Sequence, residues 1–471
     1  MGNKWDNVCI DDIKSPEKYS CVGGPFGSSL SQKHYVDSGV PVIRGVNLAG
    51  DIFSETGFVF VSQDKSNELC RNMAFRGDLV FTQRGTLGQV ALIPEDSKYE
   101  RYIVSQSQMK LTVNPQLADS YFIYTYFRTN EAKALIEKNA IVGGVPHINL
   151  GILKAFTLRL PPLFEQKRIS EISRSIDNKI TLNRQINQTL EQMAQALFKS
   201  WFVDFDPVVD NALDAGFFEQ DLEFSDELLR RAEARKALRE NADFKPLPED
   251  IRQLFPAAFE LCSEPSLGLR GWVPQTWAVN TVGDVFIVKG GSTPRTTNPD
   301  FWEGGDIHWT SPKDLSGNND KILLTTERKV TSAGLQKISS GLLPTETVLM
   351  SSRAPVGYLA LTKIPTAINQ GYIAITDTKC LSPEFTLYWL DSNMDIIKSM
   401  SGGTTFAEIS KKTFRGIQLV IPNIDVVSFF STIVGSYLSK ITKNSEECST
   451  LEDLRDYLLP KLINGEFEVN S

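Results

Sequence analysis

The chain has little of the chemistry from which metal sites are made. It contains three histidines and six cysteines in 471 residues. No two cysteines show C-x-x-C spacing, and no two histidines lie at a spacing suited to one metal ion. The residues are His34, His147 and His308, with Cys9, Cys21, Cys70, Cys262, Cys380 and Cys448. We therefore expect no metal site in this chain and free thiols at the cysteines.

Nucleotide-binding and catalytic motifs are also missing. No G-x-x-x-x-G-K-[ST] phosphate loop occurs, and no G-x-G-x-x-G follows a predicted strand. Residues 298–301 (N-P-D-F) resemble the N-P-P-[FY] turn of amino-methyltransferases, but Asp300 replaces the second proline. Residues 94–98 resemble a nuclease carboxylate–lysine cluster without a second carboxylate-bearing strand. These absences predict a chain with no catalytic residue and no cofactor of its own.

Long apolar runs are absent too. No stretch approaches the roughly 18 uninterrupted apolar residues of a membrane span. The first five residues, M-G-N-K-W, do not begin a signal peptide. With 41% hydrophobic and 23% charged residues, the composition is typical of a soluble globular protein. We expect a cytoplasmic protein with no membrane contact and at least two domains.

The net charge of −8 and the pI near 5.3 disfavour nucleic acid as a partner at first sight. The charge is unevenly distributed, however. Residues 1–160, 161–205 and 271–420 each carry a net +1, whereas residues 206–270 carry −7 and residues 421–471 carry −4. Binding to DNA therefore remains open for the near-neutral segments, and a basic partner is expected to add electrostatic attraction.

The sequence does contain a repeat with a constant offset of 261. It consists of apolar residues at steps of three and four, which predict a two-helix coiled-coil seam. The first ladder is Ile169, Ile172, Ile176, Ile180, Leu190, Met193 and Leu197, and the second is Phe430, Ile433, Tyr437, Ile441, Leu451, Leu454 and Leu458. Asn183 and Asn444 lie at the two midpoints. If the helices pair antiparallel, these asparagines should meet and satisfy each other.

The segments before the two ladders also match each other. Arg84-x-x-x-Gly88 corresponds to Arg353-x-x-x-Gly357, and residues 143–144 (G-G) correspond to residues 402–403. Short β-rich runs dominate both copies, punctuated by glycine, asparagine and proline. This organisation predicts an α+β fold: a tandem duplication of a β-rich domain plus a long helix, with the two helices packed as an antiparallel coiled coil.

These patterns divide the chain into five segments. Residues 1–160 and 271–420 are the two β-rich domains, and residues 161–205 and 421–471 are the two long helices. Residues 206–270 form an acidic helical linker, which we interpret as an ordered tether; a disordered linker is the alternative.

A duplicated chain should meet its partner through two related surfaces, and duplex DNA is the obvious candidate. Arginine can bind guanine, and glutamine or asparagine can bind adenine, through paired hydrogen bonds. Candidate DNA-binding residues lie in polar segments of both copies. They are Arg44, Asn47, Gln83, Arg84, Gln106, His147, Asn149, Arg295, Lys313, Arg353, Gln370, Lys411 and Lys412. For Arg84 and Arg353, an internal ion pair or a pinned loop is an equal alternative.

Taken together, the chain resembles the specificity subunit of type I restriction–modification systems over essentially its whole length. The resemblance rests on the duplication, on residues 196–207 (A-L-F-K-S-W-F-V-D-F-D-P) and on residues 247–251 (L-P-E-D-I). Residues 271–274 (G-W-V-P) depart from the proline-x-glycine-tryptophan order often seen there.

The resemblance implies two target-recognition domains that read an asymmetric, bipartite DNA sequence, with the helix pair as the spacer between them. It implies two modification subunits that carry S-adenosylmethionine chemistry. It also implies restriction/translocase subunits that use ATP and Mg. The competing interpretation is a scaffold protein with two β-rich binding domains and no affinity for DNA.

Overall fold

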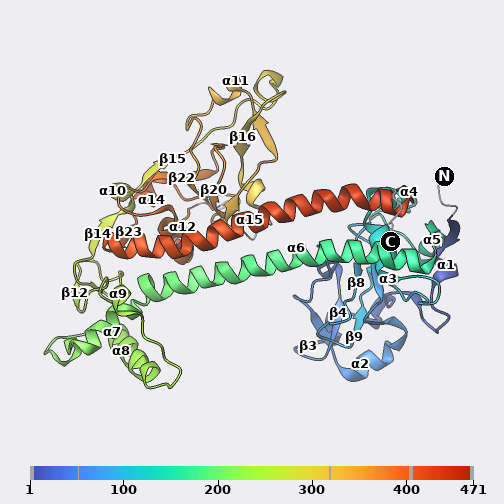
Figure 1. The fold of residues 1–471 in the computed structure, drawn as a ribbon, viewed down its shortest axis with the longest axis horizontal. Helices are drawn as coiled ribbons and strands as arrows, with labels where there is room; N and C mark the ends of the chain where they lie inside the picture. Colours follow the sequence, from blue (N-terminus) through green and yellow to red (C-terminus); the bar gives the residue numbers. More distant parts are fainter. Residues whose placement is uncertain (1–4, 51, 318–319, 403–406, 467–471) are drawn as a thin grey trace. The chain divides into compact units, whose positions relative to one another are not determined.

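The structure is a computed structural model that describes residues 5–50, 52–317, 320–402 and 407–466 (Figure 1). The chain forms two compact units. Unit 1 comprises residues 1–181 and 448–471, and unit 2 comprises residues 182–447. Each unit therefore contains one β-rich domain and a part of each long helix, α6 (Leu163–Phe198) and α15 (Ile424–Ile463). Both helices begin close to the predicted starts of the helical segments, just after Pro161-Pro162 and Pro422.

Unit 1 contains three sheets, with strand orders β1-β11, β2-β10-β7-β8 and β3-β5-β4-β9-β6. Its strands are β1 Asp6–Cys9, β2 Cys21–Gly23, β3 Tyr35–Val36, β4 Val40–Ile43, β5 Val59–Val61, β6 Met73–Phe75, β7 Leu79–Thr82, β8 Val90–Leu92, β9 Arg101–Val104, β10 Gln108–Leu111 and β11 Thr157–Leu160. Besides α6, its first 181 residues form helices α1 Ile10–Ile13, α2 Gln63–Glu68, α3 Ser120–Arg128, α4 Asn130–Lys138 and α5 Leu150–Ala155.

Unit 2 contains sheets with strand orders β12-β13, β14-β23, β15-β22-β19-β20-β17 and β18-β16-β21. Its strands are β12 Phe259–Leu261, β13 Trp272–Pro274, β14 Ala278–Thr281, β15 Ile287–Lys289, β16 Ile307–Thr310, β17 Ile322–Leu323, β18 Arg328–Val330, β19 Val348–Ser351, β20 Leu359–Thr362, β21 Ala367–Ile368, β22 Tyr372–Asp377 and β23 Gln418–Ile421. Its shorter helices are α7 Asp206–Asp214, α8 Asp226–Arg239, α9 Glu249–Arg252, α10 Val282–Val285, α11 Ser332–Leu335, α12 Pro383–Ser392, α13 Met394–Ser399 and α14 Lys411–Arg415.

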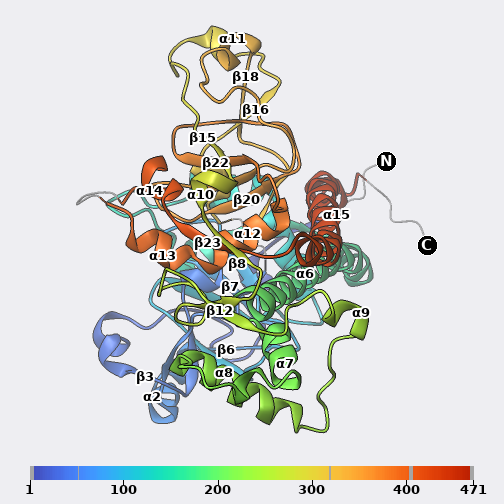
Figure 2. The same cartoon turned by 90° about the vertical axis from the view of Figure 1, so that its left-hand side faces the viewer.

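The two domains share one topology, as the duplication predicts. The order β2-β10-β7-β8 in unit 1 matches β15-β22-β19-β20 in unit 2. Antiparallel β1–β11 matches β14–β23, and parallel β4–β9 matches parallel β16–β21. Within unit 2, the sheet β18-β16-β21 and helix α11 extend away from the sheet that contains β15 and β22 (Figure 2). The α+β prediction is confirmed.

In unit 1, the parts of α6 and α15 run antiparallel. The Cys448 thiol donates a hydrogen bond to the Ile180 carbonyl oxygen, and Arg455, further along α15, reaches Asp177, which lies earlier on α6. Ile176 and Ile180 pack with Cys448 in a small apolar cluster. The coiled-coil prediction is therefore confirmed in this unit.

A buried carboxylate joins the β-rich domain of unit 1 to its helices. Asp177, which is 6% exposed, accepts a hydrogen bond from the Tyr121 hydroxyl at 2.7 Å and two from the Arg128 guanidinium at 2.6 and 3.2 Å. Arg455 of α15 lies 3.4 Å from the same carboxylate. Burial and the Asp177 charge raise the pKa of Tyr121 far above its ordinary value. Asp177 thus connects α3, α6 and α15.

In unit 2, the parts of α6 and α15 also run antiparallel, but the two asparagines do not satisfy each other as expected. The Asn183 amide donates to the Glu447 carboxylate at 2.8 Å, and the Asn444 amide donates to the Asn187 side-chain oxygen at 2.8 Å. The side-chain oxygens of both Asn183 and Asn444 lack a hydrogen-bond partner among the described residues. The register of the helices places each asparagine opposite a different polar residue.

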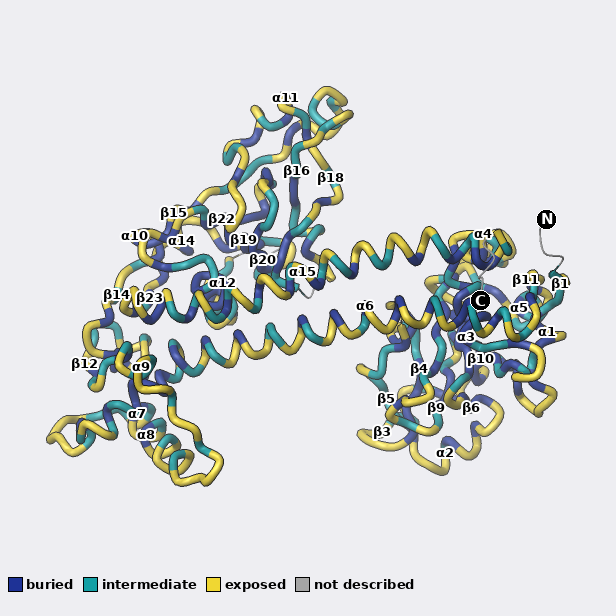
Figure 3. Tube along the Cα trace, viewed as in Figure 1, coloured by how far each residue is buried: buried dark blue, intermediate teal, exposed yellow. Residues whose placement is uncertain are grey.

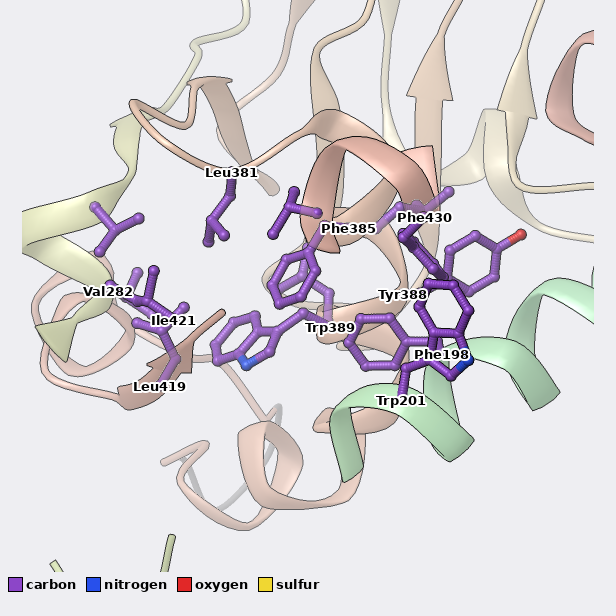
Figure 4. Packing of buried hydrophobic residues seen from close by; sticks show 14 of the residues in the cluster. Phe198, Trp201, Val282, Leu381, Phe385, Tyr388, Trp389, Leu419, Ile421 and Phe430 are labelled. Atoms are coloured by element: carbon purple, nitrogen blue, oxygen red, sulfur yellow. The ribbon is translucent and has the colours of Figure 1, made fainter. Parts of the chain in front are cut away.

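Aromatic side chains fill the junction between the end of α6 and the domain of unit 2 (Figure 4). Phe198 packs edge-on against Phe385 of α12, with ring centroids 5.3 Å apart, and against Phe430 of α15 at 5.7 Å. At the edge of this core, the Tyr388 hydroxyl donates a hydrogen bond to the Glu191 carboxylate of α6 at 2.8 Å, and Lys321 forms an ion pair with the same carboxylate. Unit 2 therefore also fixes its domain to α6 through a carboxylate, at a different place on the helix.

The predicted ladder is wrong at two positions. Met193 is 46% exposed and Leu454 is 42% exposed, while the neighbours Ala194 and Arg455 are buried. Helix α15 is long and apolar enough to cross a membrane by length and composition. In unit 2, buried apolar residues of α15 such as Val434 pack in the aromatic core just described. A core helix of a globular protein packs in this way.

Residues 206–270 are ordered in the structure and form α7, α8 and α9. Helices α7 and α8 lie parallel, joined by aspartate–arginine pairs that repeat every four residues. The pairs are Asp206–Arg231, Asp210–Arg235 and Asp214–Arg239. These aspartate–arginine pairs are partly buried, and the loops beside α7 and α8 are mostly exposed (Figure 3). Several basic side chains of this acidic segment thus form ion pairs with aspartates of the same segment.

Candidate nucleic-acid interface

Four loops come together beyond the end of β7 in unit 1. We call residues 24–34, 83–88, 105–107 and 141–149 the recognition loops of unit 1. The backbone N–H of Gln83 donates a hydrogen bond to the backbone carbonyl of Ser107 at 2.7 Å. The backbone N–H of Ile148 donates to the backbone carbonyl of Gln83 at 3.0 Å. Arg84 and His147 form an antiparallel bridge. Backbone hydrogen bonds therefore bring several of the predicted DNA-binding residues to one place.

The equivalent loops of unit 2 are residues 290–297, 352–357, 369–371 and 402–412, of which residues 403–406 lie outside the described part of the chain. The Ser352 amide donates to the Gly371 carbonyl at 2.7 Å, and the Ile409 amide donates to the Ser352 carbonyl at 3.0 Å. Arg353 and Glu408 form the bridge that Arg84 and His147 form in unit 1. The same backbone framework thus holds different side chains in the two units.

This framework corrects the sequence alignment of the last loop. Ile141 bridges His147 in unit 1, and Gly402 bridges Glu408 in unit 2. Ile141, not Gly143, is therefore the counterpart of Gly402. The corrected offset is 261, the same as that of the helix ladders.

A close backbone approach fixes the first loop of each cluster. A Cβ atom at Gly24 would overlap the Ser105 carbonyl oxygen, and a Cβ atom at Gly291 would overlap the Ile368 carbonyl oxygen. Only glycine fits at either position. Each glycine is the second of a Gly-Gly pair at the end of an equivalent strand, β2 or β15, so we take the two as counterparts, although the carbonyls that they approach are one residue out of register.

The two predicted arginines have different surroundings. Arg84 is exposed, and no ion pair of its side chain occurs within the described residues. The Arg353 side chain is 35% exposed and lies 3.7 Å from the Glu408 carboxylate. A surface pair at that distance contributes little, about 0–1 kcal/mol. The alternative that these arginines make internal ion pairs therefore has weak support at Arg353 and no support at Arg84.

Gln106 and Gln370 are exposed, but both contact the first recognition loop of their own unit. The Gln106 amide donates to the carbonyls of Gly27 and Leu30, the latter at 3.1 Å. The Gln370 side-chain oxygen accepts a hydrogen bond from the Thr293 hydroxyl at 2.6 Å. Each glutamine therefore has one end held by protein.

Several other candidates need correction. Asn47 is fully buried, and its amide donates to the carbonyls of Ser54 and Thr56 at 2.9 and 3.0 Å, so it holds a turn instead of facing solvent. Asn149 caps α5 by accepting the Ile152 amide at 2.9 Å. These two side chains are structural, because turns and helix ends require the same residue types as base recognition.

The basic candidates divide in the same way. The Arg44 guanidinium donates to the Gly57 carbonyl at 2.6 Å. Lys313 pairs with Glu327 at 2.8 Å, and this hydrogen bond raises the pKa of Lys313. Arg295, Lys411 and Lys412 are exposed, with Lys411 lying against Gly290. The candidates that best fit contact with a ligand are those that extend from the recognition loops.

Sequence reasoning missed two exposed apolar residues of the recognition loops. Phe26 is 83% exposed and Val142 is 86% exposed. The available signal was an apolar residue between turn formers, as in Pro25-Phe26-Gly27. No group of three metal-ligating side chains lies among the residues that the structure describes.

Comparison with known proteins decides the family. The profile described as "Type I restriction modification DNA specificity domain" matches residues 26–192 and 274–447. The chain belongs to this family. Apart from Gly24 and Pro25, the two matched segments contain the two sets of recognition loops, so the duplication seen in the structure is also a duplication of the family domain.

Individual relatives agree. The chain is 30% identical over 408 residues to the type I restriction enzyme HindI specificity subunit of Haemophilus influenzae, covering 83% of this chain and 86% of that protein. It is 22% identical to the putative MjaX specificity subunit of Methanocaldococcus jannaschii over 94% of this chain and 91% of that protein. The crystal structure of the type I S subunit from M. genitalium has the same fold, with a TM-score of 0.53 at 15% identity over 100% of this chain and 97% of that chain. This chain is a specificity subunit with two target-recognition domains.

Proposed function

We propose that the recognition domain of each unit reads one half of a bipartite target in double-stranded DNA. The observation that carries this proposal is the pair of recognition-loop clusters, which share a backbone framework and differ in side chains. Gln83 and His147 of unit 1 are replaced by Ser352 and Glu408 in unit 2, while an arginine is kept at Arg84 and Arg353. Because the hydrogen-bonding groups differ, the two half-sites should differ in sequence.

We propose that α6 and α15 act as the spacer between the half-sites. The part of helix α6 that carries the apolar ladder, from Ile169 to Leu197, covers 29 residues, roughly 40 Å at 1.5 Å per residue. A helix of this length suits half-sites about one duplex turn apart, about 34–36 Å between centres. The buried Asp177 and the partly buried Glu191 support this role, since the carboxylate of each fixes its own domain to α6.

We further propose that two modification subunits assemble on this chain and provide the S-adenosylmethionine chemistry. Restriction/translocase subunits that use ATP and Mg would join them in the cytoplasm. The exposed residues Met193 and Leu454, related by the offset of 261, are equivalent apolar positions for two like partners. The acidic segments 206–270 and 421–471 suit contact with basic protein surfaces instead of phosphate.

Duplex binding by the chain together with its modification subunit tests the proposal. Affinity should depend on sequence and should fall as salt rises, because cationic side chains displace counterions. Arg84→Ala should lose about 1–3 kcal/mol of binding to the target duplex, whereas Arg159→Ala, an exposed arginine on β11, should bind as the parent does. Affinity that is indifferent to both sequence and salt would favour the scaffold interpretation.

A further inference from the structure

Two equivalent positions in the recognition loops differ in polarity. Phe26 lies two residues after Gly24, and Thr293 lies two residues after Gly291. Both glycines are second in a Gly-Gly pair at the end of an equivalent strand, β2 or β15, and each lies close to a backbone carbonyl, that of Ser105 in unit 1 and that of Ile368, one residue before the counterpart of Ser105, in unit 2. Phe26 and Thr293 are therefore at the same point of the framework in the two domains.

A glutamine of the strand-end loop contacts the first recognition loop near both positions, through different atoms. The residue after Phe26, Gly27, accepts a hydrogen bond from the Gln106 amide, and the Thr293 hydroxyl donates to the Gln370 side-chain oxygen. Gln106 and Gln370 correspond to each other in the repeat. Each position thus lies beside an exposed glutamine on the strand-end loop of its own domain.

Exposure distinguishes Phe26 from a packing residue. The side chain is 83% exposed, although the preceding Pro25 is buried and holds the loop against the domain. Single exposed apolar residues are common on protein surfaces, so exposure alone means little. Here the exposed ring lies on the loop whose backbone carbonyls, at Gly27 and Leu30, bind the side chain of Gln106.

We propose that Phe26 and Thr293 occupy one base-reading position in the two domains and determine specificity there. This proposal rests on the proposed function. In the major groove, thymine alone presents a methyl group, which an aromatic side chain contacts favourably. Phe26 therefore selects thymine at one position of its half-site. Thr293 offers a hydroxyl, and its hydrogen bond orients Gln370 so that the amide nitrogen can donate to a base acceptor.

Reciprocal substitutions test the proposal in the full complex with the modification subunits, with genome-wide methylation mapping as the readout. Phe26→Thr should weaken the preference for thymine at one position of one half-site by about tenfold and leave the other half-site unchanged. Thr293→Phe should introduce a thymine preference into the other half-site only. Leu117→Thr, which changes an exposed apolar residue outside the recognition loops, should keep the parental motif.

Two outcomes would overturn the proposal. One is a parental motif in both reciprocal variants, and the other is equally reduced methylation of all sites with no change of motif. Unchanged thermal unfolding midpoints would show that neither variant perturbs folding. A bipartite parental motif combined with either outcome would reject this position while leaving the proposed function intact. A parental chain that directs no bipartite methylation would reject the proposed function itself.

Discussion

Replacing Asp177 tests how firmly the recognition domain of unit 1 is held on its helices. The carboxylate accepts three hydrogen bonds, from Tyr121 and from both terminal nitrogens of Arg128, and it lies 3.4 Å from Arg455. Asp177→Ala removes all of these and leaves two buried guanidinium groups without their shared carboxylate. Breaking a buried ion pair by removing one partner costs about 3–5 kcal/mol. For a unit of this size, the unfolding midpoint should fall by roughly 6–20 °C.

Differential scanning calorimetry measures the midpoint, and hydrogen exchange of peptides from α3 and α6 shows where protection is lost. Asp453→Ala is the matched control, because Asp453 is an exposed aspartate of α15 in the same unit. It should change stability by less than about 0.5 kcal/mol. If Asp177→Ala unfolds at the same temperature as Asp453→Ala, the carboxylate does not hold the domain and the reasoning is refuted.

Three further predictions can be checked by calorimetry. Gly24→Ala should lower the unfolding midpoint by several degrees, because its Cβ would overlap the Ser105 carbonyl, whereas Gly45→Ala, with no atom closer than 3.8 Å, should not. Burial, with Lys329 nearby, lowers the pKa of His308 below its ordinary 6.5. The unfolded chain then binds the proton more readily, so stability is lost as pH falls through the lowered pKa; between pH ~7.5 and ~5 the parent should lose more stability than His308→Gln. In a double-mutant cycle, Asp210→Ala and Arg235→Ala should show a coupling of about 1–2 kcal/mol, and additive losses would contradict the ion pair between α7 and α8.

Much of the fold was predictable because its signals are local. The β-rich segment predicted for residues 1–160 contains β1 to β11, and the two predicted long helices are α6 and α15. The pair Pro161-Pro162 marked where α6 begins, and the single Pro422 marked where α15 begins. Hydrophobic periodicity and the residues that start and end helices depend on neighbouring positions in the chain, so they can be recognised in a single sequence.

The details of pairing were not predictable, since they depend on register. Asn183 meets Glu447 instead of Asn444, because the helices are shifted relative to the position that sequence midpoints suggest. Met193 lies outside the seam, where Ala194 takes its place. The side chain of Asn47 is used inside a turn, and no feature of its sequence distinguishes that use from base recognition.

The candidate site was predicted in part. Arg84, Gln106 and His147 do converge, because Gln83 bonds to two of the other loops. Phe26 was missed because polar residues alone were considered for DNA contact. Its counterpart Thr293 became recognisable only through the close approach of Gly24 and Gly291, which involves backbone atoms far apart in sequence.

The central claim is that one chain reads two unlike half-sites with two copies of one domain. Genome-wide methylation mapping, in cells with and without this subunit, tests that claim most directly. The account predicts an asymmetric motif of two half-sites separated by a fixed gap, methylated only when the subunit is present. A single uninterrupted motif, two identical half-sites, or methylation that persists without the subunit would contradict it.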